Sequence, residues 1–232
     1  MTLNAASAVV AISQYMADLV STDLGIRRPI RLIYNGIDER CFRPVKGTRM
    51  GRRFRVLFCG NLSRRKRAGM LAPLAHALGS GFEIQYTAGL SDSPGQVVPV
   101  GADVARMRAL GCVAYADMPE VYRQVDVLLM PSVREGFGLC VAEAMASGLP
   151  VVACAESALP ELVVDRQGGY LCPVDDIACY ADAIRALAED RAGAARMGEF
   201  NRERVERLFT RERMLRDYRG LFEAVLDGGF TG

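Results

Sequence analysis

Short apolar runs alternate along the chain with stretches of helical character. The runs are rich in Val, Ile and Leu and are bounded by turn-forming residues, which is typical of buried strands. Strands are expected at residues 8–12, 30–34, 54–59, 82–88, 112–115, 126–130, 151–154 and 168–173. Helices are expected at residues 14–22, 70–78, 102–110, 118–123, 139–147, 157–162, 176–189, 192–209 and 211–226. This alternation indicates an α/β fold. Residues 45–53 and 89–101 have the composition of surface loops.

Residues 131–152 form the most informative stretch of the sequence. A turn containing Gly136 and Gly138 follows the strand expected at 126–130. The helix expected at 139–147 comes directly after that turn. A strand, a glycine turn and a helix N-terminus bring backbone N–H groups and the positive end of a helix to one place. The stretch therefore predicts an anion site.

Two glutamates lie around the start of this helix. Glu143 is the only polar side chain within residues 139–146, so its helix should be buried. A carboxylate on a buried helix is costly unless it is paired or hydrogen-bonded. We expect Glu143 to be unpaired when the site is empty. Glu135 lies in the preceding loop, and both carboxylates can face the carboxyl end of the sheet, where open α/β folds bind ligands. From the residues alone, a helix cap plus a buried ion pair explains the two glutamates equally well.

A basic turn follows the strand expected at 54–59. Its four consecutive cations are Arg64, Arg65, Lys66 and Arg67, which lead into an apolar helix. Cations at a helix N-terminus oppose the helix dipole, so a bound anion would relieve both. The alternative is a solvated basic turn, which is the usual explanation of a charge run.

Composition narrows the function classes. With 232 residues, half of them hydrophobic, the chain can bury a sizeable core, and a net charge of +2 gives no general attraction to nucleic acid or membranes. No apolar run approaches the roughly 20 residues of a membrane helix, and the start lacks the basic region of a signal peptide. We expect a protein of the cytosol, or of the inner face of the membrane. With one histidine and no CxxC pair, no metal site is expected, and the seven cysteines resemble small hydrophobic residues of a reducing compartment.

The spacing of the two glutamates resembles a known family. Glu135, seven further residues and Glu143, with Gly136, Phe137 and Gly138 after the first glutamate, resemble the motif of the retaining group-1 (family 4) glycosyltransferases. The resemblance implies a GT-B fold, in which the C-terminal domain is a Rossmann-like parallel sheet with helices on both faces and holds the nucleotide-sugar donor. It implies that Glu135 and the backbone from Gly136 to Leu139 hold the donor sugar and diphosphate. It also implies that Glu143 accepts hydrogen bonds from the ribose hydroxyls.

The same comparison gives roles to two other regions. In the family, an Arg and a Lys after the first strand clamp the donor diphosphate; Lys66 matches the lysine, so Lys66 and Glu135 are the catalytic candidates. Asn61 stands at the arginine position, and Arg64 or Arg65 is the expected replacement. The loop at Tyr115 and Ala116 matches the one that holds the nucleotide base through its backbone. His76 lies on an apolar helix and does not match the histidine of the family, so we expect a structural role for it.

The first residues resemble the end of an N-terminal acceptor domain and the linker that follows it. We therefore expect residues 1–44 to be a remnant of that domain plus the linker, with the acceptor domain largely missing. Residues 45–210 would be the donor-binding domain, and residues 211–232 a C-terminal helix and tail. The acceptor is open (a glycan, a lipid or a small molecule), and the missing domain could be a separate chain.

The combined expectation is the donor domain of a metal-independent retaining glycosyltransferase that needs no cofactor besides its nucleotide-sugar substrate. The basic side chains and the helix dipole would carry the positive charge that Mg²⁺ supplies elsewhere. A catalytically silent module that binds a nucleotide sugar or a partner is the alternative. An unrelated Rossmann-like enzyme is disfavoured, because no GxGxxG sequence follows residues 54–59.

Overall fold

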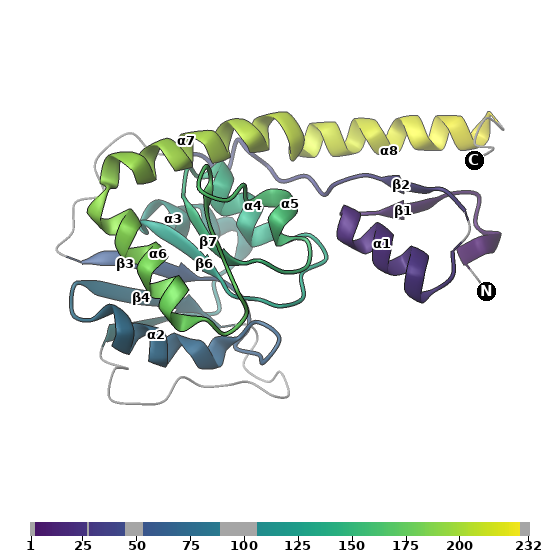
Figure 1. Cartoon of the computed structure of the whole chain (residues 1–232). Coiled ribbons are helices and arrows are strands. Elements are labelled where there is room, and N and C mark those ends of the chain that lie inside the picture. Colours follow the sequence, from purple (N-terminus) through teal and green to yellow (C-terminus); the bar gives the residue numbers. More distant parts are fainter. Residues whose placement is uncertain (1–2, 27, 45–52, 89–105, 228–232) are drawn as a thin grey trace.

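A six-stranded parallel sheet forms the centre of the protein. The computed structural model describes residues 3–26, 28–44, 53–88 and 106–227 (Figure 1). The strands of the sheet are β3 (Phe54–Phe58), β4 (Phe82–Thr87), β5 (Met107–Gly111), β6 (Val127–Met130), β7 (Val151–Cys154) and β8 (Gly169–Cys172). Their spatial order is β5-β4-β3-β6-β7-β8, and every neighbouring pair is parallel. This is the doubly wound order of Rossmann-like folds, so the expected α/β class is confirmed.

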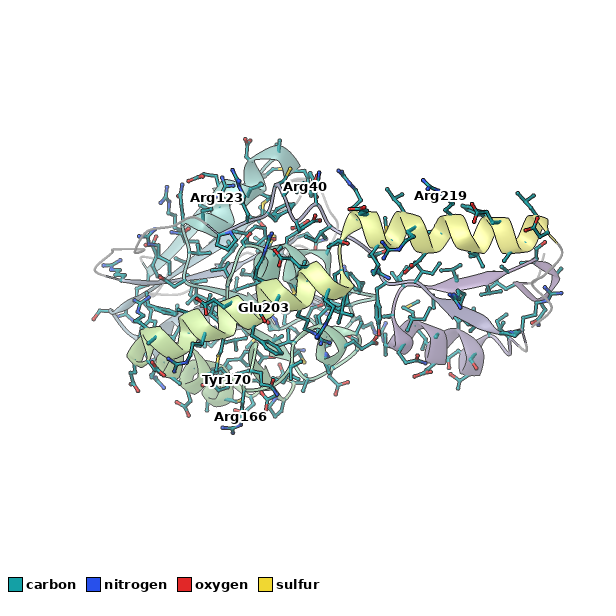
Figure 2. All side chains as sticks on the ribbon, turned by 90° about the horizontal axis from the view of Figure 1, so that it is seen from above. Arg40, Arg123, Arg166, Tyr170, Glu203 and Arg219 are labelled. Carbon is teal, nitrogen blue, oxygen red and sulfur yellow. The ribbon has the colours of Figure 1, made fainter. Side chains whose placement is uncertain are left out.

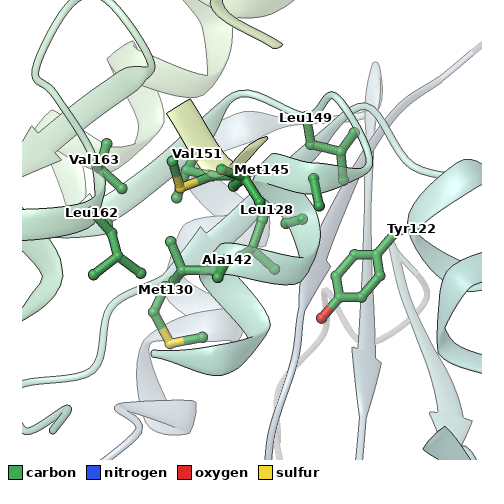
Figure 3. Packing of buried hydrophobic residues seen from close by; sticks show 14 of the residues in the cluster. Tyr122, Leu128, Met130, Ala142, Met145, Leu149, Val151, Leu162 and Val163 are labelled. Atoms are coloured by element: carbon green, nitrogen blue, oxygen red, sulfur yellow. The ribbon is translucent and has the colours of Figure 1, made fainter. Parts of the chain in front are cut away.

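Helices cover both faces of this sheet. On one face lie α2 (Leu71–Leu78) and α6 (Ile177–Glu189); on the other lie α3 (Met118–Arg123), α4 (Leu139–Ala146) and the C-terminal part of α7 (Arg191–Leu208). Successive residues of a strand point to opposite faces, so Leu128 packs towards α4 and Leu129 towards α2. Figure 3 shows the α4 side of this core. Because both faces are covered, the central strands are continuous apolar runs.

Two expectations for the edge of the sheet are wrong. The helix expected at 102–110 is not formed over Met107–Gly111, which is the edge strand β5, and the strand expected at 112–115 is also absent. Gly111 ends β5 with a φ of +70°, and a 3₁₀ helix, η4 (Tyr115–Asp117), follows. An edge strand pairs with one neighbour and exposes many side chains, so it needs no apolar run. The loop expected at 45–53 (Arg53 excepted), the loop at 89–101 and residues 102–105 lie outside the described residues.

The N-terminal segment forms a separate unit. Strands β1 (Val9–Ala11) and β2 (Ile30–Leu32) pair in parallel, and α1 (Gln14–Asp23) connects them after the short η1 (Leu3–Ala5). Ser13 caps α1, because its hydroxyl accepts a hydrogen bond from the Met16 N–H. Figures 1 and 2 show this purple unit apart from the large sheet and beside the yellow helix α8 (Arg211–Leu226), in two views turned by 90°.

The chain passes twice between the large sheet and the side of the molecule where the N-terminal unit and α8 lie, and the two passages are side by side. One is the stretch after β2, and the other is the junction between α7 and α8. The Ile37 N–H donates to the Phe209 carbonyl, and the Arg211 N–H donates to the Ile37 carbonyl, both at 2.9 Å. Gly36 lies against the Thr210 backbone so closely that a Cβ would not fit. Within the described ranges no helix is long and apolar enough to cross a membrane.

Candidate functional site

The candidate site lies where the winding of the sheet reverses. Strands β3 and β6 are neighbours at the centre of the sheet, and the chain continues from them toward opposite edges. Doubly wound sheets bind ligands at the carboxyl ends of such strands, and the region around the turns that follow β3 and β6 is called the crevice below. The basic turn follows β3, and the loop carrying Glu135 follows β6. The fold thus brings the two sequence motifs together.

Lys66 and Glu135 form a buried ion pair in this crevice. The Lys66 Nζ is 2.7 Å from the Glu135 Oε1, and both side chains are about nine-tenths buried. Gly60, with a φ of +141°, leaves room for the lysine: a Cβ there would lie 3.3 Å from the Lys66 Cε. The Glu135 N–H donates to the Ser157 hydroxyl at 3.1 Å, which fixes the loop.

The other cations of the turn point in different directions. Arg65 donates to the Arg134 carbonyl at 2.7 Å and reaches within 3.8 Å of Glu135. Arg64 is exposed, whereas Arg67 has left-handed backbone geometry and pairs with Asp175. Of the two residues expected to replace an arginine at position 61, Arg65 is therefore the one beside Glu135. The Asn61 side-chain oxygen accepts a hydrogen bond from the Ser63 hydroxyl at 3.1 Å.

Glu143 lies on α4 and has a partner. The Tyr122 hydroxyl donates to its Oε2 at 2.8 Å, so the expectation of an unpaired carboxylate is wrong. Burial raises the pKa of Glu143 from 4.5 to about 7, and the Tyr122 hydrogen bond lowers it only in part. Burial also raises the pKa of Tyr122 well above its usual value, which keeps that hydroxyl a donor. The site thus contains a carboxylate that changes charge near neutral pH.

The segment from Gly136 to Leu139 leads from the loop after β6 into the first residue of α4. Gly138 has a φ of +102° directly before α4, and a Cβ there would come 3.3 Å from the Leu159 Cδ2. The Phe137 ring points into the core, where it packs against Tyr34 with centroids 6.1 Å apart. Leu139 is half exposed at the start of the helix.

The loop at Tyr115 and Ala116 directly precedes α3, the helix that carries Tyr122, the hydrogen-bond partner of Glu143. Both loop residues are exposed in η4, and the Tyr115 ring meets Phe42 edge-on at 5.6 Å. The pKa of Tyr115 is raised by burial and next by the charge of Glu143. His76 is exposed on α2. Among the described residues, no group of three or more His, Cys, Asp or Glu side chains could hold a metal ion.

Glu161 is a residue that the sequence pattern did not single out. It lies on α5 (Leu159–Leu162) and accepts hydrogen bonds from the Gln14 N–H at 2.8 Å and the Tyr15 N–H at 2.7 Å. These are the first two N–H groups of α1, which need acceptors outside the helix. Its Oε2 also accepts from the Tyr34 hydroxyl at 3.0 Å. A carboxylate on a short helix gives no sequence signal for so distant a contact.

Glu161 therefore holds the N-terminal unit against the crevice. Ile12 directly precedes the N-cap Ser13, and Met16 lies in the first turn of α1. A Cβ on Gly136 would come 3.5 Å from the Ile12 side chain and 3.6 Å from the Met16 sulfur. The glycine loop after β6 is thus enclosed between its own helix and α1.

The strand order and the covered parallel sheet place the protein in the class of Rossmann-like α/β proteins. Residues 53–190 match the family model described as "Glycosyl transferases group 1", and residues 1–40 match "Glycosyltransferase Family 4". Since the first match spans more than half of the chain, the protein belongs to the group 1, family 4 glycosyltransferases. Its six-stranded sheet corresponds to the C-terminal domain of the GT-B fold.

Two curated relatives illustrate the range of similarity. The D-inositol 3-phosphate glycosyltransferase of Streptomyces avermitilis is 42% identical over 97 residues, which are 42% of this chain and 20% of that protein. The alpha-maltose-1-phosphate synthase of Mycobacterium tuberculosis is 30% identical over 232 positions, covering 89% of this chain and 60% of that protein. The chain therefore spans only part of the length of these relatives.

Solved structures share the fold over nearly the whole chain. Sucrose-phosphate synthase from Thermosynechococcus elongatus superposes with a TM-score of 0.82 at 28% identity, covering 96% of this chain and 60% of that one. Anabaena HepE in complex with UDP superposes with a TM-score of 0.85 at 22% identity, covering 94% of this chain and 64% of that one. A second HepE structure contains UDP-glucose.

Proposed function

We propose that the crevice binds a nucleoside diphosphate sugar and that the protein transfers the sugar to a hydroxyl acceptor with retention of configuration. The observation that carries this proposal is the buried Lys66–Glu135 pair at the carboxyl ends of β3 and β6, beside the start of α4. The Lys66 ammonium suits a diphosphate, and the Glu135 carboxylate suits sugar hydroxyls. The relatives named D-inositol 3-phosphate glycosyltransferase and alpha-maltose-1-phosphate synthase, and the HepE complexes with UDP and UDP-glucose, support this substrate class.

Each residue would have a defined role. The Lys66 ammonium would neutralise charge on the diphosphate as the sugar leaves, together with Arg65 and the N-terminus of α4. Glu135 would accept hydrogen bonds from the donor sugar, and its contact with Lys66 would position the ammonium before the donor arrives. Basic side chains and the helix terminus would then do the work that a divalent cation does elsewhere.

The nucleoside would lie between α4 and η4. Glu143, supported by Tyr122, would accept hydrogen bonds from the two ribose hydroxyls, and the backbone at Tyr115 and Ala116 would hold the base. Binding would favour the ionised form of Glu143, because a carboxylate accepts two hydroxyl hydrogen bonds more strongly than a carboxylic acid does.

We also propose a division of the chain. Residues 45–210 form the donor-binding part, residues 211–232 the C-terminal helix and tail, and residues 1–44 a piece of an acceptor-side domain plus the linker. Transfer then depends on further acceptor-side structure, in the same polypeptide or in a separate one. A silent binding module is the second candidate, supported by the fact that, among the described residues, the acceptor side contributes only the small unit of η1, β1, α1 and β2 and the residues that join it to the large sheet.

Calorimetric titration with UDP, GDP and ADP in the presence of a chelator tests the binding proposal. We expect one of the three to bind, and Lys66→Ala to weaken that binding by tenfold or more. Arg67→Ala is the matched control, because Arg67 belongs to the same basic turn but pairs with Asp175. A folded sample that binds none of the three nucleotides would refute the proposal.

A further inference from the structure

Two cysteines meet at the floor of the crevice. Cys59 directly follows β3, and Cys140 lies in the first turn of α4. Both are free thiols, and both are partly exposed. Their thiols hydrogen-bond to each other. The pair thus joins the two elements between which the diphosphate would be held.

Tyr122 links this pair to Glu143. Its hydroxyl lies 3.7 Å from the Cys59 Sγ, 3.3 Å from the Cys140 carbonyl oxygen and 2.8 Å from the Glu143 carboxylate. A change at either cysteine therefore reaches the carboxylate assigned to the ribose through one side chain.

We propose that Cys59 and Cys140 are a reactive thiol pair, which hydroperoxides convert into an intramolecular disulfide that blocks the nucleotide site. The blocking of the nucleotide site rests on the proposed function, whereas the chemistry of the thiol pair does not. The Cys59 thiolate attacks the O–O bond of the peroxide, so that an S–O bond forms, hydroxide or alkoxide leaves, and the sulfur is oxidised to a sulfenic acid. The Cys140 sulfur then attacks the Cys59 sulfur, an S–S bond forms, and water leaves with the Cys140 proton.

The surroundings of Cys59 favour the thiolate. The pKa of Cys59 is lowered to about 7 by the Cys140 hydrogen bond first, and further by hydrogen bonds from Tyr122 and Thr87 and by the charge of Lys66, against the effect of burial. An ordinary thiol with a pKa of about 8.5 is only about 3% ionised at pH 7. The charge of Glu143 also faces this group, since the two carry mutually repelling charges when both are ionised.

A second pair of cysteines provides a control within the same chain. Cys172 at the end of β8 hydrogen-bonds to Cys179 on α6, but burial and the charges around it raise the pKa of Cys172. Among the described residues, the largest effects on the pKa of Cys172 come from burial, Cys179 and two aspartates, and all of them disfavour the thiolate. We therefore expect this pair to stay reduced.

Mass spectrometry of the unreduced, digested wild-type chain after hydrogen peroxide treatment is the first test. We expect a Cys59–Cys140 linked peptide and no Cys172–Cys179 peptide. The rate of Cys59 alkylation by iodoacetamide should be half-maximal near pH 7, and Cys140→Ser should move that midpoint upward. Absence of the linked peptide, equal linkage of the second pair, or a midpoint near that of an ordinary thiol would each overturn the proposal.

Nucleotide titration of the oxidised chain is the second test. We expect affinity for the nucleotide that binds the reduced chain to fall tenfold or more, and to return on reduction with dithiothreitol. Cys59→Ser should bind nucleotide and lose the sensitivity to peroxide, whereas Cys172→Ser should keep it. If the disulfide forms and affinity is unchanged, the blocking role is refuted. If no nucleotide binds the reduced chain either, the proposed function and this blocking role fail together, while the linked peptide still establishes the reactive pair.

Discussion

Glu143 is buried among apolar side chains of α4 and receives a hydrogen bond from Tyr122. The pKa of its carboxyl group is about 7 in the folded protein and about 4.3 in an unfolded chain. Below both values the residue is protonated in both states. As pH rises between them, the unfolded chain loses the proton first, so the folded state loses stability until about pH 7 and regains none above it.

Glu143→Gln should therefore stabilise the protein in a pH-dependent way. Its advantage over wild type should be small near pH 4 and grow to about 3 kcal/mol above pH 7, following the raised pKa. Urea unfolding of both proteins at several pH values measures this difference. The variant should also bind nucleotide about tenfold or more weakly, because a hydrogen bond to a charged group contributes about 1.5–3 kcal/mol. Loss of several kcal/mol of stability at pH 8 would instead indicate a structural ion pair.

Tyr122→Phe should raise the pKa of Glu143 further, because the hydroxyl that lowers it is removed. We expect a cost of about 1–2 kcal/mol in stability when the carboxylate is ionised, since a buried acceptor then lacks its donor. The pKa can be followed by NMR of the glutamate side chain in both proteins. An unchanged pKa would show that the hydrogen bond does not support Glu143.

The residues of the site were only partly predictable. The cost of a lone carboxylate on an apolar helix singled out Glu143, and the basic turn singled out Lys66. The partner of Glu143 could not be predicted, because Tyr122 lies on another helix and only the packing of α3 against α4 brings it near. Whether the selected residues bind a donor stays a prediction.

At the scale of elements, the free N–H groups in the first turn of α1 donate hydrogen bonds to two side chains outside the helix. Glu161 accepts from Gln14 and Tyr15, and Ser13 accepts from Met16. A carboxylate at a helix N-terminus also interacts favourably with the helix dipole. The attachment of α1 to the donor-binding part therefore depends strongly on one side chain.

Glu161→Ala should loosen α1 without unfolding the large sheet. The lost hydrogen bonds cost about 1.5–3 kcal/mol locally, so amide exchange in residues 14–23 should accelerate tenfold or more. Exchange in β6 and β7 should stay unchanged. Glu156→Ala, which alters an exposed glutamate nearby, is the control. Equal acceleration in both variants would contradict the role of Glu161.

Elements with a clear apolar pattern were predicted well, and the edge of the sheet was not. The central strands are buried on both faces, so their sequences could hardly be anything but apolar runs. Strand β5 is held by backbone hydrogen bonds to β4 and exposes side chains such as Arg108 and Ala109, so residues 107–111 had the mixed pattern of a surface helix. Pairing with a neighbour that is distant in sequence decided its structure, and such pairing leaves little local signal.

At the scale of the whole molecule, most of the described core belongs to the large sheet. The N-terminal unit contributes two short strands and one helix, which bury little surface of their own. We expect the purified chain to fold cooperatively but to transfer sugar far more slowly than the roughly 1–1000 per second of typical enzymes, because positioning an acceptor supplies much of the rate. Product formation from radiolabelled donor and simple acceptors measures this. Turnover within that range would show that a complete acceptor site exists in this chain or across a dimer of it.

The two chain crossings between the N-terminal unit and the large sheet have a mechanical consequence. A single connecting strand would act as a swivel, about which the N-terminal unit could turn freely. Here the crossings at Ile37 and Thr210 are bonded to each other through the Ile37–Phe209 and Arg211–Ile37 hydrogen bonds, and Gly36 leaves no space between them. Twisting would break those bonds, whereas bending about the line through the two crossings would keep them. We therefore expect motion of the N-terminal unit relative to the large sheet to be confined to bending about this one axis, which would open and close the approach of α1 to the glycine loop at Gly136.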